Sequence, residues 1–205
     1  MKKDIGKDKS IIQIIDDIKY IESVFKNLLN ILPSFNVTDE KILPYGLKPH
    51  TRSVSWLVEQ VIVQQTKYNA NKLKLTDVNF NFSDTSLHDC EIQSNNKKYY
   101  INVKIHNIDG KENKNDISAV EKMYFQYTAN PEYNLIYACF GISFENVTVH
   151  FDKNYMVIFS PQFMPIYINS RNDKIQAQYK HEIQLRTRKE FLNLLKKNSK
   201  SIILS

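Results

Sequence analysis

The residues that could do chemistry are an acid and a lysine on two neighbouring predicted strands. Asp89 opens a predicted strand over 88–93, and Lys104 lies in the next one, over 98–105, after the turn SNNK. Asn102 is two positions from Lys104, so both side chains point to the same face. An acid that binds a divalent cation, a second oxygen ligand and an ammonium near an attacking water can hydrolyse a phosphodiester. The alternative is a solvated lysine on a sheet face beside an ordinary turn acid.

Residues for other common chemistries are missing. Cys90 and Cys139 are far apart in the chain, and neither belongs to a C-x-x-C pair, so we expect two buried thiols. The five histidines form neither H-E-x-x-H nor H-x-H, although His88 and His106 are expected near the metal. The four glycines form neither G-x-x-x-x-G-K-[ST] nor G-x-G-x-x-G, which argues against a nucleotide-driven motor or a dinucleotide enzyme.

Helices are expected before the two strands. Apolar residues recur at three- and four-residue steps over 10–32, which predicts an amphipathic helix. Three prolines then predict an irregular connection from Pro33 to about Thr51. A second helix is predicted from Ser53, as its N-cap, and it carries Glu59.

Further strands and helices are expected around the hairpin. Alternation over 73–82 predicts a half-exposed strand, and the apolar run LIYACFGISF over 135–144 predicts a buried central strand. Asp116 is expected to cap a helix that runs to about Thr128. Several short strands over 147–185 and a last helix over 187–197 complete the expected order.

The composition is that of a folded protein with a basic surface. The 205 residues are 42% hydrophobic and 24% charged, which favours one folded domain over 1–205. The formal net charge of +6 favours a polyanionic partner such as nucleic acid, although a solvated basic surface explains it equally well. The lack of a long apolar stretch predicts a cytoplasmic protein without a membrane partner.

The strand residues resemble the PD-(D/E)XK nuclease superfamily, in which an acid opens one strand and an acid-x-Lys triplet lies on the next. Here the triplet is Asn102-Val103-Lys104, and PHTRSVSWLVEQV, NDISAVEKM and LRTRKEFL resemble segments of type II restriction endonucleases. The resemblance runs from about Gly46 to Leu195. It implies an α/β fold with a central mixed β-sheet flanked by helices. The helical N-terminal segment would be 10–32, the nuclease core about 46–145, and the C-terminal strands and helix 147–199.

The resemblance also implies a Mg²⁺ site, with one departure from the pattern. The triplet normally begins with an acid, whereas the Asn102 amide oxygen can bind a cation but adds no charge. Glu91, on the same strand face as Asp89, and Glu59, on the second helix, are the candidate substitutes. The expected metal ligands are therefore Asp89, Asn102 and Glu91. Glu91 as a cross-strand partner of a lysine is the alternative.

Basic residues at two helix starts are the candidate DNA contacts. Cationic side chains, hydroxyls and free backbone N–H groups suit phosphates there. These residues are Lys48, Thr51, Arg52, Arg186, Thr187 and Arg188, with His50 as a possible addition. Surface pairing of the arginines with acids is the alternative. The alternation of Gln176, Gln178 and Lys180 is consistent with base reading and with plain surface polarity. Trp56 is expected to pack in the core or at a dimer face.

The function implied by the resemblance is a homodimeric, Mg²⁺-dependent type II restriction endonuclease. One small domain with one site needs a twofold partner to cut both strands of duplex DNA. Two alternatives stay open: a catalytically silenced DNA-binding homologue, since the triplet acid is replaced by Asn102, and a nuclease of repair or mobile-element systems.

Overall fold

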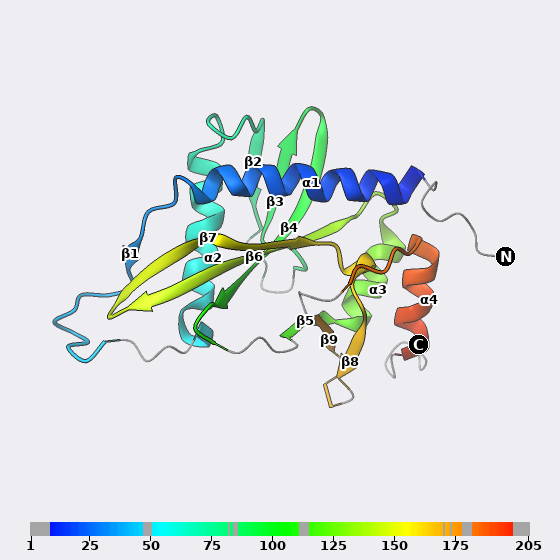
Figure 1. Cartoon of the computed structure of the whole chain (residues 1–205). Coiled ribbons are helices and arrows are strands. Elements are labelled where there is room, and N and C mark those ends of the chain that lie inside the picture. Colours follow the sequence, from blue (N-terminus) through cyan, green and yellow to red (C-terminus); the bar gives the residue numbers. More distant parts are fainter. Residues whose placement is uncertain are drawn as a thin grey trace. The chain divides into compact units, whose positions relative to one another are not determined.

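The chain folds into two compact units. Figure 1 labels their helices and strands. The structure is a computed structural model that describes residues 9–46, 51–81, 83, 86–110, 115–169, 171–172, 174–177 and 182–198. Unit 1 comprises the described residues within Met1–Lys19, Glu112–Ile136 and Phe159–Ser205, and unit 2 those within Tyr20–Lys111 and Tyr137–Ile158. No helix of the described part is long and apolar enough to cross a bilayer.

A six-stranded mixed sheet with the order β1-β7-β6-β4-β3-β2 forms the frame of unit 2. Its strands are β1 (Phe35–Asn36), β2 (Asp77–Phe80), β3 (Cys90–Ser94), β4 (Lys97–Asn107), β6 (Leu135–Glu145) and β7 (Thr148–Phe159). The first eight residues of β6 are all buried, which confirms the predicted central strand. The β3–β4 hairpin is also confirmed: Asn95 and Asn96, with φ of 49° and 62°, make its two-residue turn.

Helices α1 (Lys9–Leu29) and α2 (Thr51–Tyr68) confirm the two predicted N-terminal helices. In unit 2, Tyr20 of α1 stacks on Tyr99 of β4, and Phe25 packs edge-on against Phe140 of β6. Helix α2 packs against β4 and β2. It begins at Thr51, two residues before Ser53, near which its start was predicted.

Unit 1 contains a second sheet and the last two helices. The strands β5 (Asn115–Ala119), β9 (Lys174–Ala177) and β8 (Tyr167–Asn169) pair in the order β5-β9-β8. The short helix η2 (Pro161–Phe163) lies between β7 and β8, and α3 (Val120–Ala129) and α4 (Arg188–Asn198) complete the unit. Helix α4 confirms the predicted last helix.

Three other predictions need correction. The helix expected from Asp116 begins only at Val120, because residues 115–119 pair with β9 as strand β5. Of the strand expected over 73–82, Asp77–Phe80 form β2, residues 73–76 precede the strand, and residue 82 lies outside the described residues. The region after 147, where several short strands were expected, begins with one long strand, β7. The connection that was expected to be irregular contains a short strand, Phe35–Asn36, which pairs with β7.

Candidate active site

The start of β3 and the middle of β4 hold Asp89 next to the Asn102 triplet. Cys90 pairs with Ile101, so one residue further along this antiparallel register Asp89 lies across from Asn102. The backbone N–H of Asp89 donates to the carbonyl of Ile101 at 2.8 Å, and Asp89 Oδ2 accepts the N–H of Val103 at 2.6 Å. These bonds fix the carboxylate beside the triplet, as the sequence predicted.

Asn102 is a buried amide with one bonded end and one unbonded end. Asn102 is only 8% exposed, and its Nδ2 donates to the carbonyl of Leu87 at 2.9 Å. Oδ1 is buried and has no hydrogen-bond partner among the described residues. A buried acceptor without a partner costs about 1–3 kcal/mol. This oxygen is therefore a suitable ligand for a cation.

Helix α2 brings a second carboxylate to the same place. Glu59 Oε1 lies 3.7 Å from Lys104 Nζ, which also donates to the carbonyl of Val103 at 2.9 Å. Burial raises the pKa of Glu59 to about 7; Lys104 opposes the rise, and the negative charge of Asp89 adds to it. Burial also raises the pKa of Asp89, against the attraction of Lys104. The site thus joins two desolvated acids and one ammonium.

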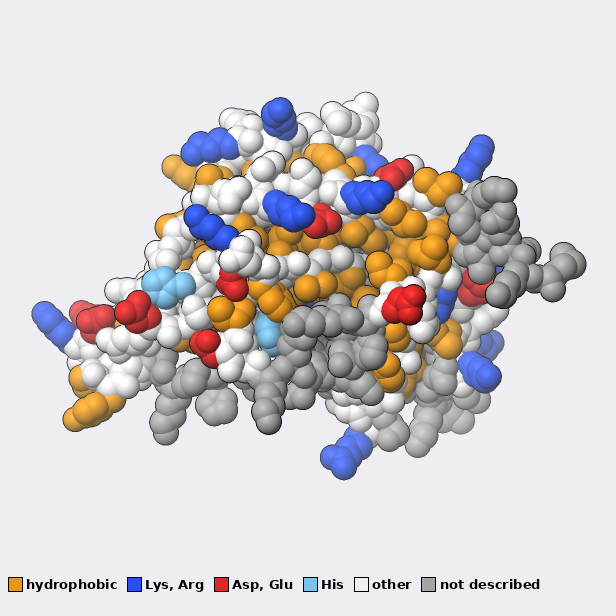
Figure 2. All heavy atoms as spheres, viewed as in Figure 1, with side chains coloured by type: hydrophobic (Ala, Val, Ile, Leu, Met, Phe, Trp, Pro, Cys, Tyr) orange, Lys and Arg blue, Asp and Glu red, His pale blue; other side chains and the backbone are white. Residues whose placement is uncertain are grey.

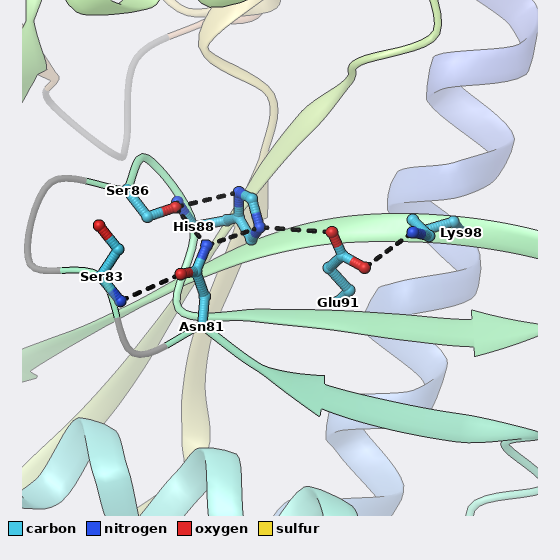
Figure 3. A network of polar contacts seen from close by, with 6 residues as sticks. All are labelled: Asn81, Ser83, Ser86, His88, Glu91 and Lys98. Atoms are coloured by element: carbon cyan, nitrogen blue, oxygen red, sulfur yellow. Dashed lines mark hydrogen bonds and ion pairs between the residues drawn. The ribbon is translucent and has the colours of Figure 1, made fainter.

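Glu91 lies on the same strand face but is bonded elsewhere. Its carboxylate is 2.8 Å from Lys98 Nζ and 3.6 Å from His88 Nε2. Figure 3 shows Glu91 between these two residues, with Asn81 next to the same nitrogen of the His88 ring. The geometry is the ion pair that the sequence left as the alternative. Within the described residues, no group of three or more His, Cys, Asp and Glu side chains could hold a metal ion.

Both thiols are buried, and each of the two histidines expected near the metal packs against a tyrosine ring. Cys90 and Cys139 are free, buried thiols, as expected, and burial raises the pKa of Cys90. Burial lowers the pKa of His88, which favours its neutral form. His106 stacks on Tyr155, with their ring centroids 4.9 Å apart.

Both arginines at the start of α4 donate to backbone carbonyls of unit 1. Arg188 donates to the carbonyls of Tyr127, Asn130 and Tyr133 at distances from 2.6 to 3.2 Å. Arg186 Nη1 donates to the carbonyls of Gln162 and Met164 at 3.1 and 2.6 Å, and Nη2 contacts Gln184. These bonds hold α4 against its neighbours.

Thr187 and Glu190 form a reciprocal cap at the same helix start. Thr187 Oγ1 lies 3.3 Å from the N–H of Glu190, whose carboxylate accepts the N–H of Thr187 at 2.8 Å. This is the capping box that T-x-x-E sequences favour. The Glu190 carboxylate accepts from the N–H and the hydroxyl of Thr187, which were predicted to face a phosphate. The DNA-binding role of this helix start therefore stays a prediction.

Other predicted DNA contacts lie partly beyond the described residues. Lys48, His50, Gln178 and Lys180 are outside them, and Thr51 and Arg52 form the first turn of α2 with side chains that are not described. Trp56 is 69% exposed in the single chain, so it does not pack in the core. On the face seen in Figure 2, basic and acidic side chains are interspersed over the described residues.

The sequence missed the backbone oxygen that orients Asn102. The carbonyl of Leu87 accepts the amide of Asn102, and the flanking Ser86 and His88 bond to each other and to Asn81. The run of turn-forming residues before Asp89 was the available signal, since Ser and Asn side chains bond to nearby backbone groups. It did not indicate which carbonyl they would hold.

The donor set fits a hard divalent cation. Asp89 and Glu59 supply carboxylate oxygens, and Asn102 Oδ1 supplies a buried neutral oxygen without another partner among the described residues. Mg²⁺ prefers such oxygen ligands and commonly uses only one or two protein carboxylates.

The mixed sheet flanked by helices is a restriction-endonuclease-like fold. Among solved structures, the chain is similar to the NlaIV restriction endonuclease, with a TM-score of 0.55 and 9% sequence identity. The similarity covers 93% of this chain and 80% of that chain. No protein-family model and no curated protein matches the sequence.

Proposed function

We propose that the chain is a Mg²⁺-dependent DNA endonuclease of the type II restriction kind. The observation that carries this proposal is the meeting of Asp89, Glu59 and Lys104 at the triplet that contains Asn102, whose Oδ1 has no hydrogen-bond partner among the described residues. The restriction-endonuclease-like fold supports a nuclease. The three sequence segments that resemble type II enzymes support the narrower class, with SwaI as the particular relative that we propose.

The site residues divide into ligands and groups that act on water. Asp89, Asn102 and Glu59 would hold Mg²⁺, which would neutralise charge on the scissile phosphate. Lys104 would orient the attacking water through its ammonium group. Without metal Glu59 has a pKa of about 7, so binding of Mg²⁺ would displace its proton near neutral pH. Glu91 stays a second candidate ligand, which would have to leave Lys98.

The proposed partner is double-stranded DNA bound by a homodimer. Twofold symmetry would place one site at each strand of a palindromic sequence. The proposed phosphate contacts are Lys48, Thr51, Arg52, Arg186, Thr187 and Arg188. The backbone bonds of Arg186 and Arg188 leave these two a structural role as well.

The rival function is a DNA-binding homologue that no longer cleaves. The neutral Asn102 in place of the triplet acid favours it, because the site has one negative charge fewer than the superfamily pattern. The two functions differ in one measurable property, since both bind DNA and only one cuts it.

The deciding experiment is digestion of long DNA of known sequence with the purified protein and Mg²⁺, followed by sequencing of the ends. Defined ends at one palindromic sequence support restriction, and scattered ends support an unspecific nuclease. Lys104→Ala should abolish cleavage and keep DNA binding, because Lys104 acts on the transition state. Lys26→Ala is the matched control, since Lys26 forms an exposed pair with Glu22 on α1. Normal cleavage by Lys104→Ala would refute the site.

A further inference from the structure

The loop between β2 and β3 determines how the Asn102 amide is oriented. An amide has a donor end and an acceptor end, whereas both oxygens of a carboxylate accept. Because Nδ2 of Asn102 donates to the Leu87 carbonyl, the position of that carbonyl decides where Oδ1 points. An acid at this place in the triplet would need no such guide. The substitution of the acid by Asn102 therefore makes the loop part of the site.

The two neighbours of Leu87 are held by one polar cluster (Figure 3). Asn81 Nδ2 lies 2.6 Å from Ser86 Oγ and 3.0 Å from His88 Nε2. His88 Nδ1 lies 3.3 Å from Ser86 Oγ, which also accepts the backbone N–H of His88 at 3.2 Å. The imidazole of His88, the residue after Leu87, is thus bonded to Ser86, the residue before it.

The ends of the loop are also fixed. The backbone N–H of Asn81 donates to the carbonyl of Asp89 at 2.9 Å, and the side chain of Leu87 is buried, at 6% exposure. The cluster of Asn81, Ser86 and His88 therefore leaves the Leu87 carbonyl little freedom to rotate.

We propose that His88 is a positioning residue, which through Asn81 and Ser86 fixes the Leu87 carbonyl and so directs Asn102 Oδ1 toward a bound divalent cation. This inference rests on the proposed metal-dependent function. Partners of this kind, one shell beyond the ligands, commonly change metal affinity by about 10- to 100-fold when they are removed.

The test is the affinity for Mn²⁺, followed by electron paramagnetic resonance without DNA, in three variants of His88. His88→Ala removes the ring, and His88→Leu fills a similar volume without hydrogen bonds. In His88→Gln, Oε1 can accept from Asn81 in place of Nε2. We expect the Ala and Leu variants to bind Mn²⁺ at least about tenfold more weakly and the Gln variant to retain most of the affinity.

The matched control is His150→Ala. His150 lies on β7 in the same unit, and its ring is bonded to Ser34. The Mn²⁺ affinity of this variant should equal that of the natural chain. If circular dichroism shows that His88→Ala does not fold, Asn81→Ala removes the same contact from the other side.

Four outcomes would count against the proposal in different ways. Unchanged Mn²⁺ affinity in His88→Leu and Asn81→Ala would overturn it. Rescue by Leu as well as by Gln would show that the ring only fills space, and would overturn it too. Absence of Mn²⁺ binding by the natural chain would refute the proposed metal site itself, whereas DNA cleavage with normal Mn²⁺ affinity in every variant would refute only the role of His88.

Discussion

Replacement of Glu59 by Gln should stabilise the protein and inactivate it. The carboxyl has a pKa of about 7 in the folded chain, against an ordinary value of 4.5, chiefly because it is buried. Between these two pH values the folded chain holds a proton that the unfolded chain has lost. The free energy of unfolding therefore falls as the pH rises from about 4.5 to about 7, and the loss is complete above that range.

The size of the effect follows from the same two values. A rise from 4.5 to about 7, at about 1.36 kcal/mol per pKa unit, corresponds to roughly 3 kcal/mol of ionisation penalty in the folded state. The value of about 7 already includes the opposing effects of Lys104 and Asp89 on the carboxyl, so they need no separate correction. Glu59→Gln should match the natural chain near pH 4.5 and exceed its stability by up to about 3 kcal/mol at pH 8.

The assay is urea unfolding of both proteins over this pH range without divalent metal, together with cleavage in Mg²⁺. Glu22→Gln is the control, because Glu22 forms an exposed pair with Lys26 and should leave the pH profile unchanged. Mg²⁺ should stabilise the natural chain above pH 7 and stabilise Glu59→Gln less. Parallel pH profiles of the natural chain and Glu59→Gln would refute the buried carboxyl, and undiminished cleavage would refute its part in the reaction.

Three further predictions concern Asn102, Arg188 and Trp56. Asn102→Asp loses the donor to the Leu87 carbonyl and places a negative charge next to it, so without metal it should lower the free energy of unfolding by about 1–3 kcal/mol, and Mg²⁺ should restore part of this loss. Thermal unfolding with and without Mg²⁺ measures the effect, and equal stability of the two proteins without metal would contradict it. Arg188→Ala should lower the free energy of unfolding, measured in urea, by about 2–4 kcal/mol, because it leaves the carbonyls at the end of α3 without their donor. Full stability together with an altered salt dependence of DNA binding would instead favour a phosphate contact. Trp56, the single tryptophan, is 69% exposed, so its emission should shift little on unfolding; a large red shift that grows with protein concentration would show that a second copy buries it.

Patterns of local origin were readable from the sequence. Alternation and the turn SNNK predicted the β3–β4 hairpin, because strand side chains alternate between faces and consecutive strands pair through a short turn. The same pairing brought Asp89 to the triplet. The apolar run of β6 predicted a buried strand, because it is short and rich in aliphatic and aromatic residues, and the first eight residues of the strand carry no charge.

Contacts between distant segments were decided only by the tertiary structure. Residues 115–119 form a strand and not a helix start, because β9, more than fifty residues later by sequence, supplies the pairing partner. The sequence favoured Glu91 over Glu59 as a metal ligand, whereas in the folded chain Lys98 pairs with Glu91 and α2 brings Glu59 to Lys104. Whether a side chain meets a cation or a neighbour depends on where other elements pack, and sequence spacing within one strand does not contain that information.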